Sequence, residues 1–393
     1  MKRKILTTEG DIIYSRYVLR PIDDKSASIL KNTYNVKTIV PLDILLGIQN
    51  LPFKVSIGMM LEIAYWAVKL SSYQDAENYF LRTKNISISN DTIRKIVNYV
   101  GAIVYEADCY EAENARKRLE SCTMHAQYNK EGVLYLMTDG AALNTRTKNS
   151  DGSTWKENKL AVAFSDDNIF FWKNKKGERQ HKIGKREYVT LIGNVQDFKY
   201  HIFALAQRNG YGKFKNTVLI SDGATWIRNL KEELFPDAQQ ILDLFHLKEN
   251  TYEFAKDVFN NDERQYMPWA ENICSQLEEG KWKNVLEKLK PYQDRTMKPG
   301  CVNLYTYITN NKDNIDYPAY KAKGWFVGSG AIESGNKTVL QNRLKLPGMR
   351  WNVSTAQYVL SLKAKLESGL WDSYVIPLIA KKMSGAVALR ISV

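Results

Sequence analysis

The sequence predicts a mixed α/β core that carries a long helical insertion and follows a mainly helical N-terminal region. Three observations predict this class. Apolar residues recur with helical spacing from residue 56 to about 107. Short apolar runs at 133–137 and 217–221 each end in Asp-Gly, as buried strands often do. Helical spacing then returns after residue 242 and continues to about 292. The sheet is therefore expected in the middle of the chain.

The N-terminal region is expected in two parts. Residues 1–55 alternate apolar and polar positions, most clearly at 11–20, which predicts a small β-containing segment. Residues 56–128 are expected to be helical, and 110–128 within them form a charged connector. The apolar stripes that predict the first two helices are Met60, Ile63, Ala64, Ala67 and Val68, and then Ala76, Tyr79 and Phe80.

A third helix is predicted from about Ser89. The short polar side chains at residues 89–91 suit an N-cap, because they accept hydrogen bonds from free backbone amides of the first turn. Arg94 and Lys95 lie on its polar side, while Ile93, Ile96, Val97 and Val100 face inward. Short helices that end in such a helix predict a helix-turn-helix DNA-binding region, with Arg94 and Lys95 at the DNA. Simple packing of a helical bundle produces the same pattern and remains the alternative.

The central region alternates strands and helices in a defined order. Strands are expected at 133–137, 155–164, 169–172, 217–221 and 240–242, and helices at 194–208, 225–234 and from Gly330 onward. Three strands, helix, strand, helix, strand, insertion and helix is the order of elements in the ribonuclease H-like fold. The predicted divisions are a first part of this core at 129–245, a helical insertion at 246–325, a last core helix at 326–371, and a C-terminal tail at 372–393.

Asp139 and Asp222 occupy equivalent places in this core, since each follows a buried strand and precedes a glycine. Side chains at the carboxyl ends of strands project into the crevice where ligands bind. In a ribonuclease H-like sheet the two strands are neighbours, so the carboxylates are expected to share Mg²⁺, or Mn²⁺, with two ions in the site. The glycines are expected to let the chain turn away. An Asp-Gly pair is also a common turn signal, which is the alternative for each aspartate taken alone.

Glu333 is the candidate for the third metal ligand and catalytic residue. It lies in a glycine-rich segment at 328–337, near the start of the last core helix. Its longer side chain suits a ligand that must reach toward the strand ends. An acid in the first turn of a helix also complements the helix dipole, and this is the alternative for Glu333.

Basic residues dominate two stretches of a chain whose formal net charge is +13. Such a charge favours polyanionic partners. Glu333 is the one acid among eight Lys or Arg residues between 321 and 365, and 173–186 carries seven Lys or Arg against one Glu. Lys337 is expected to support the active site, one turn beyond Glu333. The residues expected at the DNA phosphates are Lys173, Lys175, Lys176, Arg343, Lys345 and Arg350. For residues 173–186, an exposed basic loop is the alternative.

Other classes of protein receive little support. No window approaches the roughly 18 apolar residues of a membrane-spanning helix, and the basic start is followed by no apolar run that would indicate a secretory signal. The four cysteines (Cys109, Cys122, Cys274 and Cys301) form no C-x-x-C pair, and the histidines are scattered, so a structural zinc site is not expected.

The motifs resemble those of DDE transposases of bacterial insertion sequences, closest to the Kra-type and Lre-type groups. The resemblance extends over about residues 131–371. It rests on TDG at 138–140, WKENK at 155–159, SDGATWI at 221–227, ILDLFHL at 241–247, and the segment 328–351 that ends in RLKLPGMRW.

This resemblance implies an α/β ribonuclease H-like catalytic domain with an all-α insertion, and Asp139, Asp222 and Glu333 as the catalytic, metal-binding triad. It also implies a role for Asp243 and His246, which match an Asp-x-x-His pattern that follows the second aspartate in related transposases. They are expected to orient the metal site or contact the transposon end. A polar pair that caps the following helix is the alternative.

The activity implied is Mg²⁺-dependent cleavage at the ends of an insertion sequence, followed by strand transfer into target DNA. The expected partners are double-stranded DNA, as terminal inverted repeats and target, and a second copy of the chain on paired ends. The expected location is the cytoplasm of a bacterium, at the nucleoid. Alternatives are a ribonuclease H-like nuclease without strand transfer, and an inactive or host-adopted DNA-binding relic of a transposase.

Overall fold

The computed structural model describes residues 1–34, 36–121, 127–177 and 179–385, and the chain divides into two compact units. Unit 1 comprises Met1–Cys109, Asn144–Thr154 and Thr338–Val393, and unit 2 comprises Tyr110–Leu143 and Trp155–Lys337. Residues after 337 belong to the same unit as the N-terminal region, whereas the sequence predicted a single core segment over 326–371. In the described ranges, no helix is long and apolar enough to cross a membrane.

Unit 1 begins with an antiparallel hairpin, as the alternation in residues 1–55 predicted. Its strands are β1 (Lys2–Thr7) and β2 (Gly10–Ser15). Two helices that the sequence did not predict follow in the same segment, α1 (Asp24–Tyr34) and α2 (Pro41–Leu45). Their apolar spacing is short and interrupted, so periodicity alone did not distinguish them from loops.

Unit 1 is otherwise helical. Its helices are α3 (Ile57–Lys69), α4 (Tyr73–Lys84), the first part of α5 (Asn90–Glu120), α14 (Asn342–Leu344), α15 (Val353–Glu367), the π-helical turn η5 (Trp371–Val375) and α16 (Ile376–Gly385). Helix α3 packs against α4, α15 and β1, and the predicted apolar stripe from Met60 to Val68 is buried. Part of the predicted tail is therefore helical, and its residues 386–393 lie outside the described residues.

The predicted third helix is longer than expected. Ser89 caps it through a hydrogen bond from the Thr92 amide to Ser89 Oγ (3.3 Å). The four apolar positions predicted to face inward, Ile93 to Val100, are all fully buried. The helix continues unbroken to Glu120, so the first part of the predicted connector belongs to α5, and residues 122–126 of that connector lie outside the described residues. The helix-turn-helix assignment of α3 to α5 stays a prediction.

Unit 2 contains a five-stranded mixed sheet in the order β7-β4-β3-β8-β9. The strands are β3 (Lys130–Asn144), β4 (Trp155–Ser165), β7 (Glu187–Ile192), β8 (Phe214–Ser221) and β9 (Gln239–Leu242). Strand β3 pairs in parallel with β8, β8 pairs in parallel with β9, and β4 pairs antiparallel with β7. Helix α6 (Val195–Arg208) packs against β4 and β7, and α7 (Thr225–Leu234) packs against α6.

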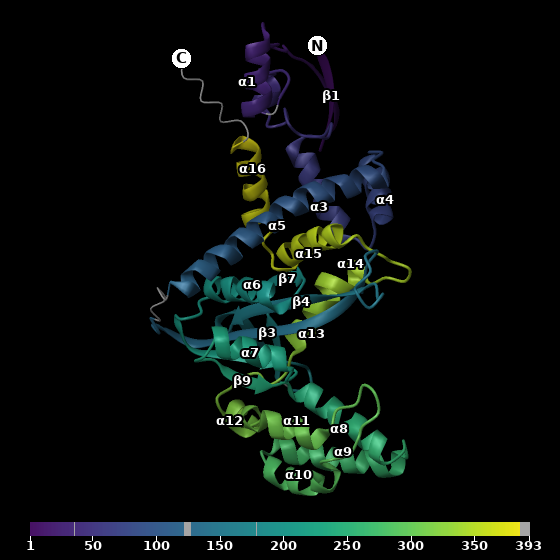
Figure 1. Cartoon of the computed structure of the whole chain (residues 1–393), viewed down its shortest axis with the longest axis vertical. Helices are drawn as coiled ribbons and strands as arrows, with labels where there is room; N and C mark the ends of the chain where they lie inside the picture. The colour runs from purple at the N-terminus through teal and green to yellow at the C-terminus, as the bar shows by residue number, and fades with distance from the viewer. Residues whose placement is uncertain (35, 122–126, 178, 386–393) are drawn as a thin grey trace. The chain divides into compact units, whose positions relative to one another are not determined.

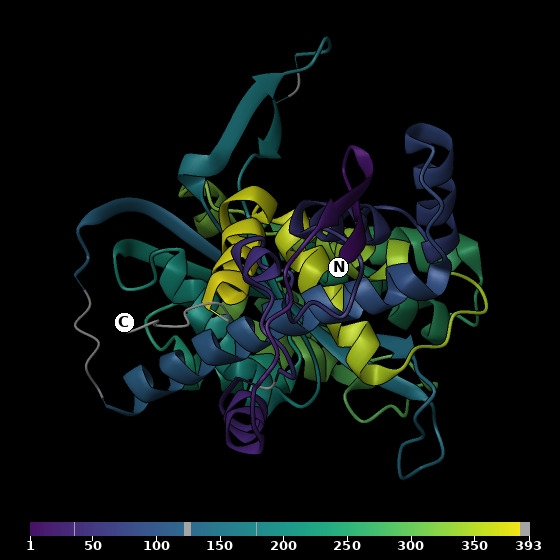
Figure 2. The same ribbon diagram turned by 90° about the horizontal axis from the view of Figure 1, so that it is seen from above.

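One predicted strand belongs elsewhere. Strand β5 (Ile169–Lys173) pairs with β6 (Arg179–Ile183) in a separate two-stranded hairpin that extends away from the sheet (Figure 2). The third sheet strand is β7, which the sequence prediction missed. The apolar run at 169–172 was misleading because Phe170, Phe171 and Trp172 are each about half exposed, at 62%, 50% and 49%.

The predicted helical insertion is present as a group of helices next to β9 (Figure 1). The helices are α8 (Leu244–Val258), α9 (Glu263–Glu278), α10 (Trp282–Leu289), α11 (Leu304–Asn311) and α12 (Tyr317–Ala322). Helix α9 packs against α8, α10 and α12. The short helix α13 (Gly330–Gly335) then returns to the sheet and packs against β4.

Candidate active site

Asp139 and Asp222 lie at matching heights on adjacent parallel strands. Met137 of β3 is paired with Ile220 of β8, and Asp139 lies two residues further along β3 while Asp222 directly follows the end of β8. Burial raises the pKa of the Asp139 carboxyl group, and the negative charge of Asp222 adds to this effect. The predicted neighbourhood of the two aspartates is therefore present, and the pair has the mutual repulsion that a cation would relieve.

The two glycines that follow these aspartates differ. Gly223 has a φ of +86°, and a Cβ there would come within 2.8 Å of Leu242, so the turn away from β8 requires glycine. Gly140 makes no turn, because β3 continues through it to Asn144. The prediction that the first strand ends at Asp139 is therefore wrong. A Cβ at Gly140 would meet only the terminal carboxylate of Glu157, a flexible side chain that can move aside, so the structure gives no steric reason for this glycine.

Asn336 is a site residue that sequence reasoning missed. Its Nδ2 donates a hydrogen bond to Asp139 Oδ2 at 2.6 Å. The residue is 6% exposed, and its Oδ1 is buried without a hydrogen-bond partner. Asn336 begins the π-helical turn η4 (Asn336–Gln341), an irregularity often found at functional sites. The signal for Asn336 in the sequence was its position three residues, or about one helical turn, after Glu333.

Glu333 lies on α13 and is exposed. Ser329 Oγ lies 2.6 Å from Glu333 Oε1 and 2.7 Å from Asp243 Oδ2, so its single hydroxyl proton is shared between the two carboxylates. Within the described part of the chain, the group spaced to hold a metal ion consists of Asp243, His246 and Glu333, with ligand atoms within 4.8 Å of one another. Asp139 and Asp222 are not part of this group. The predicted triad of Asp139, Asp222 and Glu333 therefore stays a prediction, because the close group that contains Glu333 is completed by Asp243 and His246.

Asp243 is fully buried and organises this second group. Its carboxylate accepts hydrogen bonds from the Ser329 hydroxyl (2.7 Å) and amide (2.9 Å), and from the amides of Phe245 and His246. Burial raises the pKa of Asp243, but the hydrogen bonds from His246 and Ser329 outweigh burial and lower it overall. Asp243 thus caps α8, as the structural alternative predicted, and also ties α8 to the segment that carries Glu333.

His246 carries a positive charge at neutral pH in this arrangement. Its Nδ1 lies in hydrogen-bond contact with Asp243 Oδ2, and this contact raises the pKa of His246 to about 9. The negative charge of Asp222 raises it further, and His246 in turn acts to lower the pKa of Asp139. His246 therefore links the Asp243 group electrostatically to the aspartate pair.

The residues predicted to contact DNA differ in exposure. Exposed side chains are those of Arg94, Lys95, Lys173, Lys175, Lys176, Lys337, Lys345 and Arg350. Arg94 and Lys95 both form ion pairs with Asp91. Arg343 requires a correction, because its side chain is buried at 1% exposure. Its guanidinium group is covered by Tyr73 and Trp351, so it is not available as a direct contact on the surface.

Comparisons with known proteins add little. No protein-family model matches the chain, and no curated protein matches its sequence. Among solved structures, the chain matches a Drosophila P element transposase strand transfer complex with 10% identity, over 84% of this chain and 83% of that chain. The TM-score is 0.24, an overlap too small to indicate a shared fold. The resemblance to bacterial insertion-sequence transposases stays a prediction.

Proposed function

We propose that the chain is a metal-dependent DNA transposase with a ribonuclease H-like catalytic core. The observation that carries the proposal is the pair Asp139 and Asp222 on neighbouring parallel strands. The sheet order supports the ribonuclease H-like core, because the first strand of the sheet in sequence, β3, lies between β4 and β8. The helical group between Asp222 and Glu333 supports the predicted insertion.

The residues present fit a divalent cation. Asp139 is a partly buried carboxylate beside a second carboxylate, and the buried Oδ1 of Asn336 is an oxygen without a partner next to them. Carboxylate and amide oxygens are the ligands that Mg²⁺ and Mn²⁺ prefer. Asp139 and Asp222 would hold the metal, with Glu333 as the third ligand. Bound there, the metal would supply Lewis-acid activation of an oxygen at the phosphodiester.

The remaining side chains of the site would position the metal-binding carboxylates and neutralise the negative charge of the phosphodiester. Asn336 orients the Asp139 carboxylate through its 2.6 Å hydrogen bond. Ser329 holds the Glu333 carboxylate, and Asp243 holds Ser329, so the position of Glu333 depends on a buried group. The protonated imidazole of His246 places a positive charge where a phosphodiester with its negative charge would approach.

The test is an assay with DNA that carries the sequences flanking the gene. We expect purified protein with Mg²⁺ or Mn²⁺ to cut at a repeated sequence and to join a pre-cleaved 3′-hydroxyl end to a second DNA. Cutting without joining would assign the nuclease alternative. Neither product, from protein that binds the DNA, would assign an inactive relic and refute the proposal.

A matched pair of variants makes the assay specific to the site. Asp139→Asn keeps the shape of the side chain and removes its charge, and we expect it to abolish cutting. Asp151→Asn makes the same change at an exposed loop position and should leave cutting unchanged. Equal activity of both variants would show that Asp139 does not hold the metal.

A further inference from the structure

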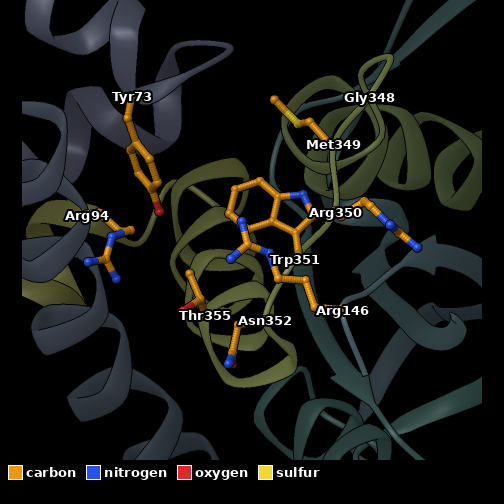
Figure 3. Close-up of a pocket in the computed structure, with 9 residues that line it drawn as sticks. All are labelled: Tyr73, Arg94, Arg146, Gly348, Met349, Arg350, Trp351, Asn352 and Thr355. Carbon is orange, nitrogen blue, oxygen red and sulfur yellow. The ribbon is translucent and has the colours of Figure 1, made fainter. Parts of the chain in front are cut away.

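Unit 1 contains a pocket of about 940 Å³ (Figure 3). The volume lies in the range of pockets that bind small molecules or single nucleotides. The residues that line it come from α4, the start of α5, the loop after β3, and the segment before and at the start of α15. They are Tyr73, Arg94, Arg146, Gly348, Met349, Arg350, Trp351, Asn352 and Thr355.

The pocket is positively charged. Arg94, Arg146 and Arg350 line it with exposed side chains, and none of the lining residues is an aspartate or glutamate. Arg94 shares its charge with Asp91, which does not line the pocket. Arginine forms paired hydrogen bonds with the oxygens of a phosphate, so three arginines around one space indicate an anionic ligand.

A fourth positive charge lies behind the wall of the pocket. The guanidinium carbon of Arg343 is 4.5 Å from the ring centre of Tyr73 and 5.2 Å from that of Trp351, both pocket residues. In the described ranges of the chain, no carboxylate lies within ion-pair distance of Arg343, and its buried Nη2 makes no hydrogen bond. Burial lowers the pKa of Arg343, and the contributions of Tyr73 and of the more distant Asp75 carboxylate offset this effect only in part. An anion in the pocket would compensate the charge of Arg343.

Apolar side chains make up much of the rest of the wall, beside Asn352 and Thr355, and hydrogen bonds hold several of its parts in place. Trp351 Nε1 donates to the Leu344 carbonyl at 3.0 Å, and Arg343 Nε donates to the Ala67 carbonyl at 3.1 Å. The Arg146 amide donates to the Trp351 carbonyl at 2.8 Å, which fixes the loop that carries Arg146 beside Trp351. The side chains of Tyr73, Met349 and Trp351 thus offer an apolar surface between the arginines (Figure 3).

We propose that this pocket binds one nucleotide of a DNA strand, with its phosphate on Arg146 and Arg350 and its base against the apolar wall. A free phosphate would use the arginines and leave the apolar wall without a function, whereas a nucleotide uses both. A nucleotide outside the base stack can lay its base against the apolar wall, whereas a duplex keeps its bases stacked and presents its phosphates on a convex surface. The proposal rests on the proposed function only in naming DNA as the source of the nucleotide.

The test compares two double variants that remove the same charge from unit 1. Arg146→Gln with Arg350→Gln removes two arginines of the pocket, and Arg20→Gln with Arg82→Gln removes two exposed arginines that do not line it. The probe is a labelled single-stranded oligonucleotide, measured by fluorescence anisotropy at several salt concentrations. Thermal melting of all variants checks that they remain folded.

We expect the pocket variant to bind the single strand at least about tenfold more weakly than wild type, with a salt slope reduced by about 0.7 for the one lost phosphate contact. The control variant should stay within about twofold. Equal losses in both variants, or no loss in either, would overturn the proposal. A strand with abasic sites should bind wild type more weakly than the intact strand, and equal binding of the two would overturn the role given to the base.

Failure of this proposal is distinguishable from failure of the proposed function. Protein that binds DNA through the pocket but cuts no DNA with any metal would keep the pocket and refute the transposase. Protein that cuts and joins DNA, with full activity in the pocket variant and unchanged binding, would keep the transposase and refute the pocket.

Discussion

The acidic strand ends of unit 2 and the arginine pocket of unit 1 present the same physical situation with opposite sign. Asp139 lies partly buried beside Asp222, and Arg343 lies buried behind three further arginines. In both places like charges gather with incomplete compensation. His246 acts on the aspartate pair, and Asp91 pairs with Arg94. In the described part of the chain, no carboxylate lies within ion-pair distance of Arg343. Such groups are costly for folding, so a ligand of opposite charge is the natural reason for them.

Other buried charges in the same chain are neutralised. Lys365 is 2% exposed and pairs with Asp108 at 2.7 Å. Asp43 is 1% exposed and accepts hydrogen bonds from Arg3 and Tyr14, each at 2.6 Å. The chain therefore pairs its buried charges where they serve the fold. Paired buried charges stabilise the fold, whereas unpaired buried charges mark the places where a ligand would bind.

The largest expected effect is on catalysis at the acidic strand ends. Asp222→Asn should lower DNA cleavage by about 10³-fold or more, because the carboxylate would bind the metal that stabilises charge in the transition state. Removal of a negative charge should leave DNA binding equal or tighter. Gel assays of cleavage and anisotropy of binding measure the two effects. Loss of binding together with cleavage would assign Asp222 to the fold instead.

Removal of a buried charge that is already paired should lower the stability of the fold. Asp43→Ala leaves Arg3 and Arg16 without their shared partner and should lower the free energy of unfolding by about 3–5 kcal/mol. Urea denaturation measures this change. Lys382→Gln, which breaks an exposed ion pair with Glu106, is the control and should cost no more than about 1 kcal/mol. Similar small losses in both would remove the contrast between paired and unpaired charges.

Arg343→Met tests directly whether the buried charge of Arg343 contributes to the stability of the fold. The substitution replaces a buried, unpaired charge with an apolar chain of similar length, so the free energy of unfolding should stay within about 1 kcal/mol of wild type or rise. Binding of single-stranded DNA should weaken in the same variant. A loss of several kcal/mol in stability would instead show that Arg343 is paired in solution and serves the fold.

A smaller effect concerns pH. Because the hydrogen bond to Asp243 raises the pKa of His246 from its ordinary value of 6.5 to about 9, the folded state binds this proton more tightly than the unfolded chain. The contribution of His246 to stability should be complete below about pH 6.5 and lost as the pH rises through 9. His246→Gln should flatten this slope in denaturation curves between pH 6 and 9, and an unchanged slope would contradict the assignment.

The sequence predicted the parts of the fold that depend on local pattern. Apolar runs located β3, β4, β8 and β9, and α7 begins and ends where expected, at Thr225 and Leu234. Pattern alone did not locate β7, and it assigned the exposed aromatic run at 169–172 to the sheet. Both errors have one cause, since an apolar run does not show whether the folded chain buries it in the central sheet.

The candidate site was predictable to a similar extent. Buried apolar runs followed by Asp-Gly singled out Asp139 and Asp222, although β3 continues past Asp139, and the Asp-x-x-His pattern singled out Asp243 and His246. Asn336 was missed because an amide gives no charge signal in a sequence. Arg343 was misassigned because a basic stretch predicts exposed cations, whereas packing between Tyr73 and Trp351 buries this one.

The most direct test of the account is calorimetric titration of the protein with Mn²⁺, in parallel for wild type, Asp139→Asn and Asp222→Asn. If the strand-end aspartates hold a metal, wild type should bind Mn²⁺ and each variant should bind it at least tenfold more weakly. Asp151→Asn should bind as wild type does. Equal Mn²⁺ binding by wild type and both site variants, or none by wild type at millimolar metal with DNA present, would contradict the account.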